Sequence, residues 1–150
     1  MKTLIFLAIA ALIAFSKGNL CRPDAFPNHN NSKCFQVIRS AVRFDQASEI
    51  CQNFGGNLTS IVSAADNKIV TSKKDTAEEV LLWIGGRKIL GRWVWLDGAT
   101  SSYENWRWGD SNDERDFCLG ISYTGFWRSM KCSEERQFIC EFCLASGCPY

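Results

Sequence analysis

Eight cysteines constrain the fold of this chain more than any other feature. All of them follow an apolar N-terminal segment, in which Met1-Lys2 precedes an uninterrupted apolar run over 4–15. That run is shorter than the roughly 20 residues that cross a bilayer. Small residues at Ala14, Ser16 and Gly18 complete the layout of a secretory signal peptide. We therefore expect residues 1–18 to be removed, with cleavage after Ser16 or Gly18, rather than retained as a membrane anchor.

An even number of cysteines in a secreted chain predicts disulfides. Counting alone leaves about 100 pairings open. The segment CEFC (140–143) is similar to a metal or redox C-x-x-C motif, but no second such motif occurs and His29 is the only histidine. We interpret the cysteines as structural, in one domain of about 130 residues.

Charge and motif content exclude several classes of function. Basic and acidic residues number 17 and 16, and no basic stripe occurs, so we expect neither nucleic acid nor a membrane surface as partner. Nucleophilic catalysis needs a base held near a Ser or Cys. His29 lies in a polar loop and disulfides would occupy the thiols, while a phosphate-binding G-x-x-x-x-G-K motif is absent. The chain is predicted not to be an enzyme.

The first half of the mature chain predicts a hairpin and two helices. Residues 21–38 form a turn-rich segment that leads into a strand. A first helix is indicated by apolar residues at helical spacing, namely Phe44, Ala47, Cys51 and Phe54, before Gly55-Gly56. A short strand is expected over 57–62, and Ser63-x-x-Asp66 is a capping-box variant that opens a second helix.

The second half predicts strands and one long loop. Short aromatic and β-branched runs separated by turn residues occur at 81–86, 92–95, 117–123, 126–129 and 137–142. The stretch 97–116 has few apolar residues, and loops of that length are usually functional or disordered. Trp106 and Trp108 favour an ordered loop, because aromatic side chains bury large areas. The fold class is therefore α+β.

The order of these motifs resembles the C-type lectin domain. The shared features are a helix ending in GGNL, then WIGG, WVWLDG, YENW, FW before a cysteine, and FICEF. They cover residues 21–142. The resemblance implies two helices with small antiparallel sheets, a long ordered loop, and the N-terminal hairpin of the long form over 21–38. Residues 143–150 are left as a short C-terminal clip.

The resemblance also implies disulfide pairs. They are Cys51–Cys140, Cys118–Cys132 and Cys21–Cys34, and the remaining Cys143 and Cys148 would pair with each other. The same resemblance assigns Trp83, Trp93, Trp95 and Trp106 to structural positions. Trp108 stands beside the long loop's acidic residues and is a candidate ligand contact.

Lectins of this family hold a calcium ion in the long loop, where sugar hydroxyls coordinate it. Calcium takes six to eight oxygen ligands, several of them charged. At the matching positions this chain has Asp110-Ser111-Asn112, in which Ser111 replaces a proline, and Asp116, two residues before a cysteine. Three of the five side-chain ligands are thus kept in altered form.

The last two ligand positions carry Arg128 and Ser129 instead of an Asn-Asp pair. A permanent cation replaces an amide and a carboxylate oxygen there. We predict that Arg128 pairs with Asp110 or Asp116 in place of the ion, the alternative being that Arg128 points into solvent. In either case we expect no calcium at this site, and no other cofactor is expected.

The resemblance implies a secreted binding protein, acting in innate defence, that recognises an extracellular glycan or protein ligand through residues 104–129. The candidate contacts are Trp108, Asp110, Asn112, Asp116, Arg128 and Ser129. The alternatives are a structural or interaction protein (toxin-like, matrix or eggshell component) and a calcium-dependent lectin. The even cysteine count predicts a monomer or a non-covalent oligomer. Asn30 and Asn57 lie in N-glycosylation sequons.

Overall fold

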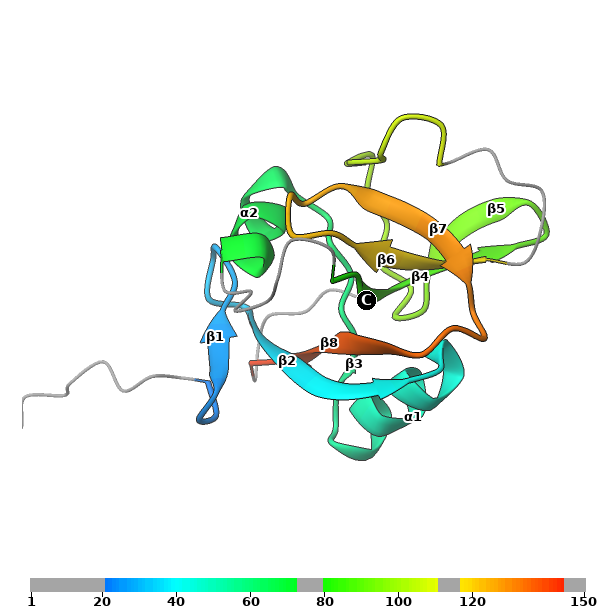
Figure 1. The fold of residues 1–150 in the computed structure, drawn as a ribbon. Helices are drawn as coiled ribbons and strands as arrows, with labels where there is room; N and C mark the ends of the chain where they lie inside the picture. The colour runs from blue at the N-terminus through cyan, green and yellow to red at the C-terminus, as the bar shows by residue number, and fades with distance from the viewer. Residues whose placement is uncertain (1–20, 73–79, 111–116, 145–150) are drawn as a thin grey trace, which may run out of the picture.

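The computed structural model describes residues 21–72, 80–110 and 117–144 (Figure 1). It confirms the α+β class: two helices accompany a sheet whose strands follow the order β1-β2-β8-β4-β6-β7, with β3 paired to β8 and β5 paired to β4. The elements are β1 (Ala25–Pro27), β2 (Lys33–Val42), α1 (Phe44–Asn53), β3 (Asn57–Leu58), α2 (Ala64–Ser72), β4 (Leu82–Ile89), β5 (Arg92–Trp95), β6 (Phe117–Ile121), β7 (Trp127–Lys131) and β8 (Arg136–Cys143).

The expected N-terminal hairpin is formed by β1 and β2. β2 continues to Val42, well past the segment 21–38, because it pairs antiparallel with β8 from Lys33 opposite Cys143 to Val42 opposite Arg136. The second and last strands of the described chain therefore lie side by side. The long loop belongs to the other part of the sheet, which β4, β5, β6 and β7 build (Figure 1).

Helix α1 confirms most of the predicted apolar face, since Phe44, Ala47 and Cys51 are fully buried. The prediction is wrong for Phe54, whose side chain is 50% exposed. The helix ends at Asn53, and the chain then turns through Gly55 at φ 82°. This left-handed turn, which glycine adopts without steric cost, ends the helix. The Phe54 N–H still donates to the Ile50 carbonyl at 3.1 Å, so Phe54 keeps its place at the helix end, where its ring is exposed.

Helix α2 begins as its capping motif predicts: the Ser63 Oγ accepts a hydrogen bond from the Asp66 backbone N–H at 3.1 Å. The strand expected over 57–62 is limited to the two residues of β3. At Ser60 the backbone N–H donates to the Glu141 carboxylate at 2.9 Å instead of to a neighbouring carbonyl. Because the Ser60 N–H bonds to a side chain, the backbone pairing between β3 and β8 does not continue to this residue.

In the described part of the chain, two large buried clusters make up most of the core, and a small third one surrounds the Cys21–Cys34 disulfide. One contains Phe44 of α1 and Trp83 of β4, whose rings meet edge to face at 5.6 Å. The other contains Val70 of α2 and Trp127 of β7, with aromatic side chains of the long loop packed against it. Among the described residues, no helix has the length and apolar character needed to cross a bilayer.

The three disulfides that the resemblance implies are present: Cys21–Cys34, Cys51–Cys140 and Cys118–Cys132. Cys51–Cys140 joins α1 to β8, and Cys118–Cys132 joins β6 to the segment after β7. Cys148, the expected partner of Cys143, lies outside the described residues.

Candidate ligand-binding site in the long loop

An aromatic cluster holds the long loop against the sheet. The Trp127 ring of β7 is contacted nearly edge-on by Trp95, Tyr103 and Trp106, with ring centroids 5.4–5.7 Å away. Trp93 packs against Trp106 with the two rings tilted and their centroids 4.9 Å apart. Such pairs stabilise beyond the area they bury. The structural roles predicted for Trp93, Trp95 and Trp106 agree with this packing.

Backbone hydrogen bonds fasten the same loop to β7. The Trp127 N–H donates to the Asn105 carbonyl at 2.7 Å, and the Arg107 N–H donates to the Trp127 carbonyl at 2.9 Å. Trp106 is thereby held beside Trp127 in a parallel bridge. These bonds hold residues 105–107 at the edge of the sheet, and the described part of the loop ends at residue 110.

Asn67 of α2 connects the helix to this site, and the sequence interpretation missed it. Its Oδ1 accepts from Trp127 Nε1 at 2.9 Å, and its Nδ2 donates to the Gly125 carbonyl at 3.2 Å. The Asn105 amide donates to the same carbonyl at 2.8 Å. The sequence did contain a sign of this role, because Asn67 stands three residues before Val70 and therefore on the same face of the helix. A polar amide on the buried face of a helix indicates a buried hydrogen-bond partner.

Arg128, Arg107 and Asp110 meet at the end of the described loop. Arg128 lies on β7 opposite Gly120, and its Nε is 3.4 Å from the Asp110 Oδ2. The Arg107 Nε is 3.7 Å from the same oxygen. Arg128 therefore pairs with Asp110, as predicted for one of its two candidate partners, instead of pointing alone into solvent.

The contact between Arg128 and Asp110 is an ion pair without hydrogen-bond geometry. Within the described residues, Arg128 Nε, Asp110 Oδ2 and Ser129 Oγ are buried atoms that have no hydrogen-bond partner. Charge attraction, and not a directed hydrogen bond, holds the two side chains together. Asn112 and Asp116, the other predicted contacts, lie outside the described residues.

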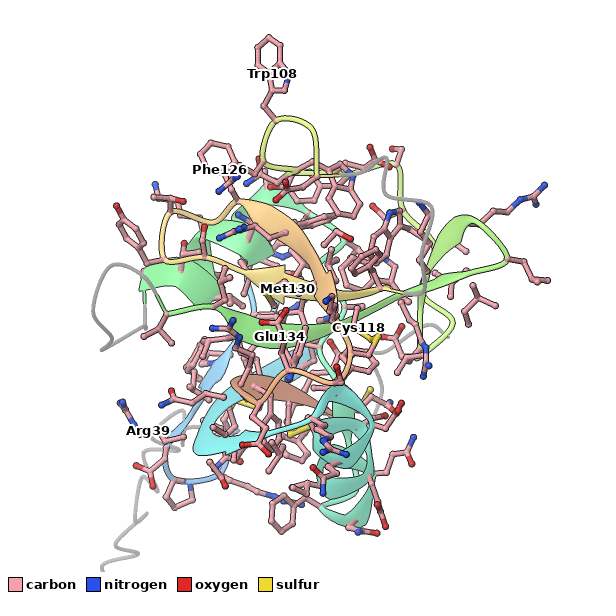
Figure 2. The ribbon with its side chains drawn as sticks, turned by 45° about the vertical axis from the view of Figure 1, so that its right-hand side comes forward. Arg39, Trp108, Cys118, Phe126, Met130 and Glu134 are labelled. Atoms are coloured by element: carbon pink, nitrogen blue, oxygen red, sulfur yellow. A yellow bond between two sulfur atoms is a disulfide. The ribbon has the colours of Figure 1, made fainter. Side chains whose placement is uncertain are left out.

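Trp108 stands apart from the aromatic cluster. Its side chain is 98% exposed and projects from the tip of the loop, at the same end of the molecule as Phe126 (Figure 2). A fully exposed tryptophan contributes nothing to the core and leaves both faces of its ring open. The sequence interpretation of Trp108 as a candidate ligand contact remains a prediction.

A second polar cluster lies beside the first residues of the long loop, Asp97 to Thr100, and the sequence interpretation missed it as well. Lys33 Nζ is 2.7 Å from the Glu141 Oε2, with side chains only 8% and 3% exposed. Burial raises the pKa of Glu141, while the Lys33 charge and hydrogen bond lower it. Nearby, the His29 Nδ1 is 2.8 Å from the buried Asp66 carboxylate.

The two sequons occupy different environments. Asn30 is exposed in the turn between β1 and β2, whereas Asn57 is half-buried in β3 beside β8. Asn30 is thus accessible for glycan attachment in the folded chain.

Comparisons with known proteins agree with the fold. The model of the Lectin C-type domain matches residues 40–142. The galactose-specific lectin nattectin of Thalassophryne nattereri is 31% identical over 119 residues, which is 75% of either chain. Human lithostathine is similar in structure, with a TM-score of 0.73 at 25% identity, over 89% of this chain and 99% of that one. A calcium-independent type II antifreeze protein superposes with a TM-score of 0.70 at 25% identity, over 82% and 94%. The chain belongs to the C-type lectin domain family.

Proposed function

We propose that this protein is a secreted binding protein, acting in innate defence, that recognises an extracellular glycan or protein ligand through the long-loop face, residues 104–129, without calcium. The N-terminal segment 1–18 supports secretion because it has the layout of a signal peptide. The protein binds its ligand and does not transform it.

One observation carries the metal-free part of this proposal: the Arg128 guanidinium lies 3.4 Å from the Asp110 carboxylate. In a calcium-binding relative, that carboxylate would face the ion. A guanidinium about 4 Å from a divalent cation would be repelled by about 8 kcal/mol at an effective dielectric of about 20, before solvent screening. The ion pair neutralises the Asp110 charge, and the cation makes a divalent ion unfavourable there.

Two features support the long-loop face as the binding surface: the packed aromatic cluster beneath it and the exposed Trp108 side chain that projects from it. Its base is rigid, because the aromatic cluster and the Asn67 bridge fix residues 103–107 and 125–127. From that base Trp108 projects fully exposed. A rigid platform that presents an open aromatic face costs little conformational entropy when a ligand binds.

Glycan-array binding in calcium and then in excess chelator tests the proposal. We expect glycan signals that survive chelation unchanged. Signals abolished by chelator would refute the metal-free site. If no glycan binds in either condition, glycan recognition is refuted, and a protein ligand would have to be recovered with the same long-loop face.

Calorimetric titration with calcium tests the metal directly. We expect no saturable binding at calcium concentrations up to the millimolar range. Micromolar binding that disappears in Asp116→Ala would contradict the proposal, because that carboxylate belongs to the ligand set of the family's calcium site.

A further inference from the structure

Three arginines from separate segments line one open pocket of about 530 Å³ next to the proposed binding face. Arg107 comes from the long loop, Arg128 from β7 and Arg136 from the start of β8. The turn between β6 and β7 completes the pocket with Thr124 and the exposed rings of Tyr123 and Phe126. We call it the arginine pocket.

Positive charge exceeds negative charge among the described residues around the arginine pocket. Asp110 is shared between Arg107 and Arg128, and Arg136 pairs with Glu134. In the part of the chain that the structure describes, three guanidinium groups thus face two carboxylates. The pocket is a favourable place for one additional negative charge.

The guanidinium groups of Arg107 and Arg128 have donor capacity to spare. Their side chains are 55% and 37% exposed, and in the described part of the chain neither group donates a hydrogen bond. A guanidinium carries five N–H donors in a planar fork that matches the paired oxygens of a carboxylate or a sulfate. Because the contacts with Asp110 at 3.4 and 3.7 Å are not hydrogen bonds, a ligand that forms two such bonds competes with them effectively.

The remaining lining favours a saccharide as the bearer of that anion. Tyr123 and Phe126 offer aromatic surface to the apolar face of a sugar ring, as aromatic residues in ligand pockets do. Ser122 Oγ donates to the Phe126 carbonyl at 3.0 Å, so in its 2.7 Å contact with Thr124 it accepts. The Thr124 oxygen keeps a lone pair that can accept from a ligand hydroxyl.

We propose that the arginine pocket binds an acidic glycan, with a sulfate ester or carboxylate on the guanidinium groups and the sugar ring against Tyr123 and Phe126. This inference rests on the proposed function and adds the chemical class of the ligand. Sulfate and carboxylate share the required geometry, so the test includes both.

Calorimetry of the full mature chain in excess chelator tests this. The probes are a heparin oligosaccharide for sulfate, an oligogalacturonate for carboxylate, a neutral oligogalactan of the same length, and an oligoglutamate peptide. We expect one or both acidic glycans to bind at least about tenfold more tightly than the galactan and the peptide. This preference should weaken as salt rises.

Three variants, Arg107→Gln, Arg128→Gln and Arg136→Gln, should each weaken acidic-glycan binding about tenfold or more, the effect of losing a charged hydrogen bond. Arg92→Gln is the matched control, because Arg92 is an exposed arginine on β5 outside the pocket, and it should bind like the unmodified chain. Arg107 lies in a loop and its side chain is 55% exposed, so we expect Arg107→Gln to fold. That variant therefore tests the pocket even if another variant fails to fold.

The results separate this inference from the proposed function. Binding of the neutral galactan alone would overturn the acidic-glycan assignment and leave glycan recognition standing. Tighter binding of oligoglutamate would replace the glycan with an acidic protein segment. If Arg92→Gln and the pocket variants lose the same affinity for the acidic glycan, the effect comes from net charge alone, and the assignment of the site to the arginine pocket is refuted. No binding to any of the three glycans would overturn the acidic-glycan assignment, and the proposed function would then require a protein ligand.

Discussion

Replacing Lys33 with methionine removes the ammonium group from the buried pair with Glu141 and preserves the shape of the side chain. The Nζ of Lys33 contacts the Glu141 Oε2 at 2.7 Å and the Ser60 carbonyl at 3.0 Å. Breaking a buried ion pair by removing one partner costs about 3–5 kcal/mol, because the other charge stays buried. Glu141 would keep hydrogen bonds from Thr59 and Ser60, each at 2.9 Å. We therefore expect a loss near the lower end, about 3 kcal/mol at neutral pH.

The loss should depend on pH in a defined direction. Burial raises the pKa of Glu141 above its ordinary value, and Lys33 opposes that rise, so Lys33→Met raises the pKa further. An acid whose pKa is higher in the folded chain stabilises the fold fully below its unfolded pKa and loses that stabilisation as the pH rises through its folded pKa. The difference between variant and wild type is thus smallest near pH 4 and largest near pH 7.5.

Urea unfolding followed by tryptophan fluorescence at both pH values measures this difference at constant ionic strength. Lys68→Met is the matched control, since Lys68 is exposed on α2, and it should lie within about 0.5 kcal/mol of wild type. If Lys33→Met equals that control at neutral pH, or if its deficit grows as the solution is acidified, the assigned role of the buried pair is refuted.

Three further variants test other parts of the structure. Cys51→Ala/Cys140→Ala opens a disulfide between residues 89 apart, and we expect urea unfolding to show a loss of about 4–5 kcal/mol; a loss under about 1 kcal/mol would contradict the loop-closure argument. Gly85→Ala would place a Cβ 2.5 Å from the Leu58 carbonyl oxygen, so a drop of about 1–3 kcal/mol should appear, whereas unchanged stability would show that β3 and β4 can separate. Trp108→Ala should leave the urea midpoint unchanged, because the side chain is exposed, and should weaken glycan binding; wild-type affinity would remove Trp108 from the site.

The fold was predictable from the sequence where a local motif marks an element or where the order of motifs matches that of the C-type lectin domain. The helical spacing of Phe44, Ala47 and Cys51 marks α1, and the Ser63 motif marks the start of α2. Phe54 shows the limit of spacing, because it keeps the helical position at the end of α1 and its ring is nevertheless exposed.

The polar contacts between residues far apart in the sequence were harder to predict. Lys33 and Glu141 are 108 residues apart, and neither carries a local sign of its partner. Lys33 follows a polar turn as the first residue of β2, and Glu141 lies inside the apolar strand β8, where a charge indicates that a buried partner exists but does not identify it. The pairing becomes apparent only once β2 lies against β8.

The candidate site was predictable from the sequence only where its residues match ligand positions of the family. Alignment with the family's ligand positions brings Arg128 and Asp110 together, and the structure has them in contact. Arg107 and Arg136 belong to no such motif, and they join the arginine pocket through the course of the loop and the start of β8. A pocket assembled from three separate segments leaves no pattern in any one of them.

The hydrogen bonds between residues 105–107 and Trp127 have a consequence for self-association. β7 is the last strand of the sheet order, and an uncovered last strand offers unpaired amide and carbonyl groups to any other extended chain. Here Asn105 and Arg107 already occupy the Trp127 backbone groups that point outward. The loop thus blocks edge-to-edge pairing with another chain at this point of β7.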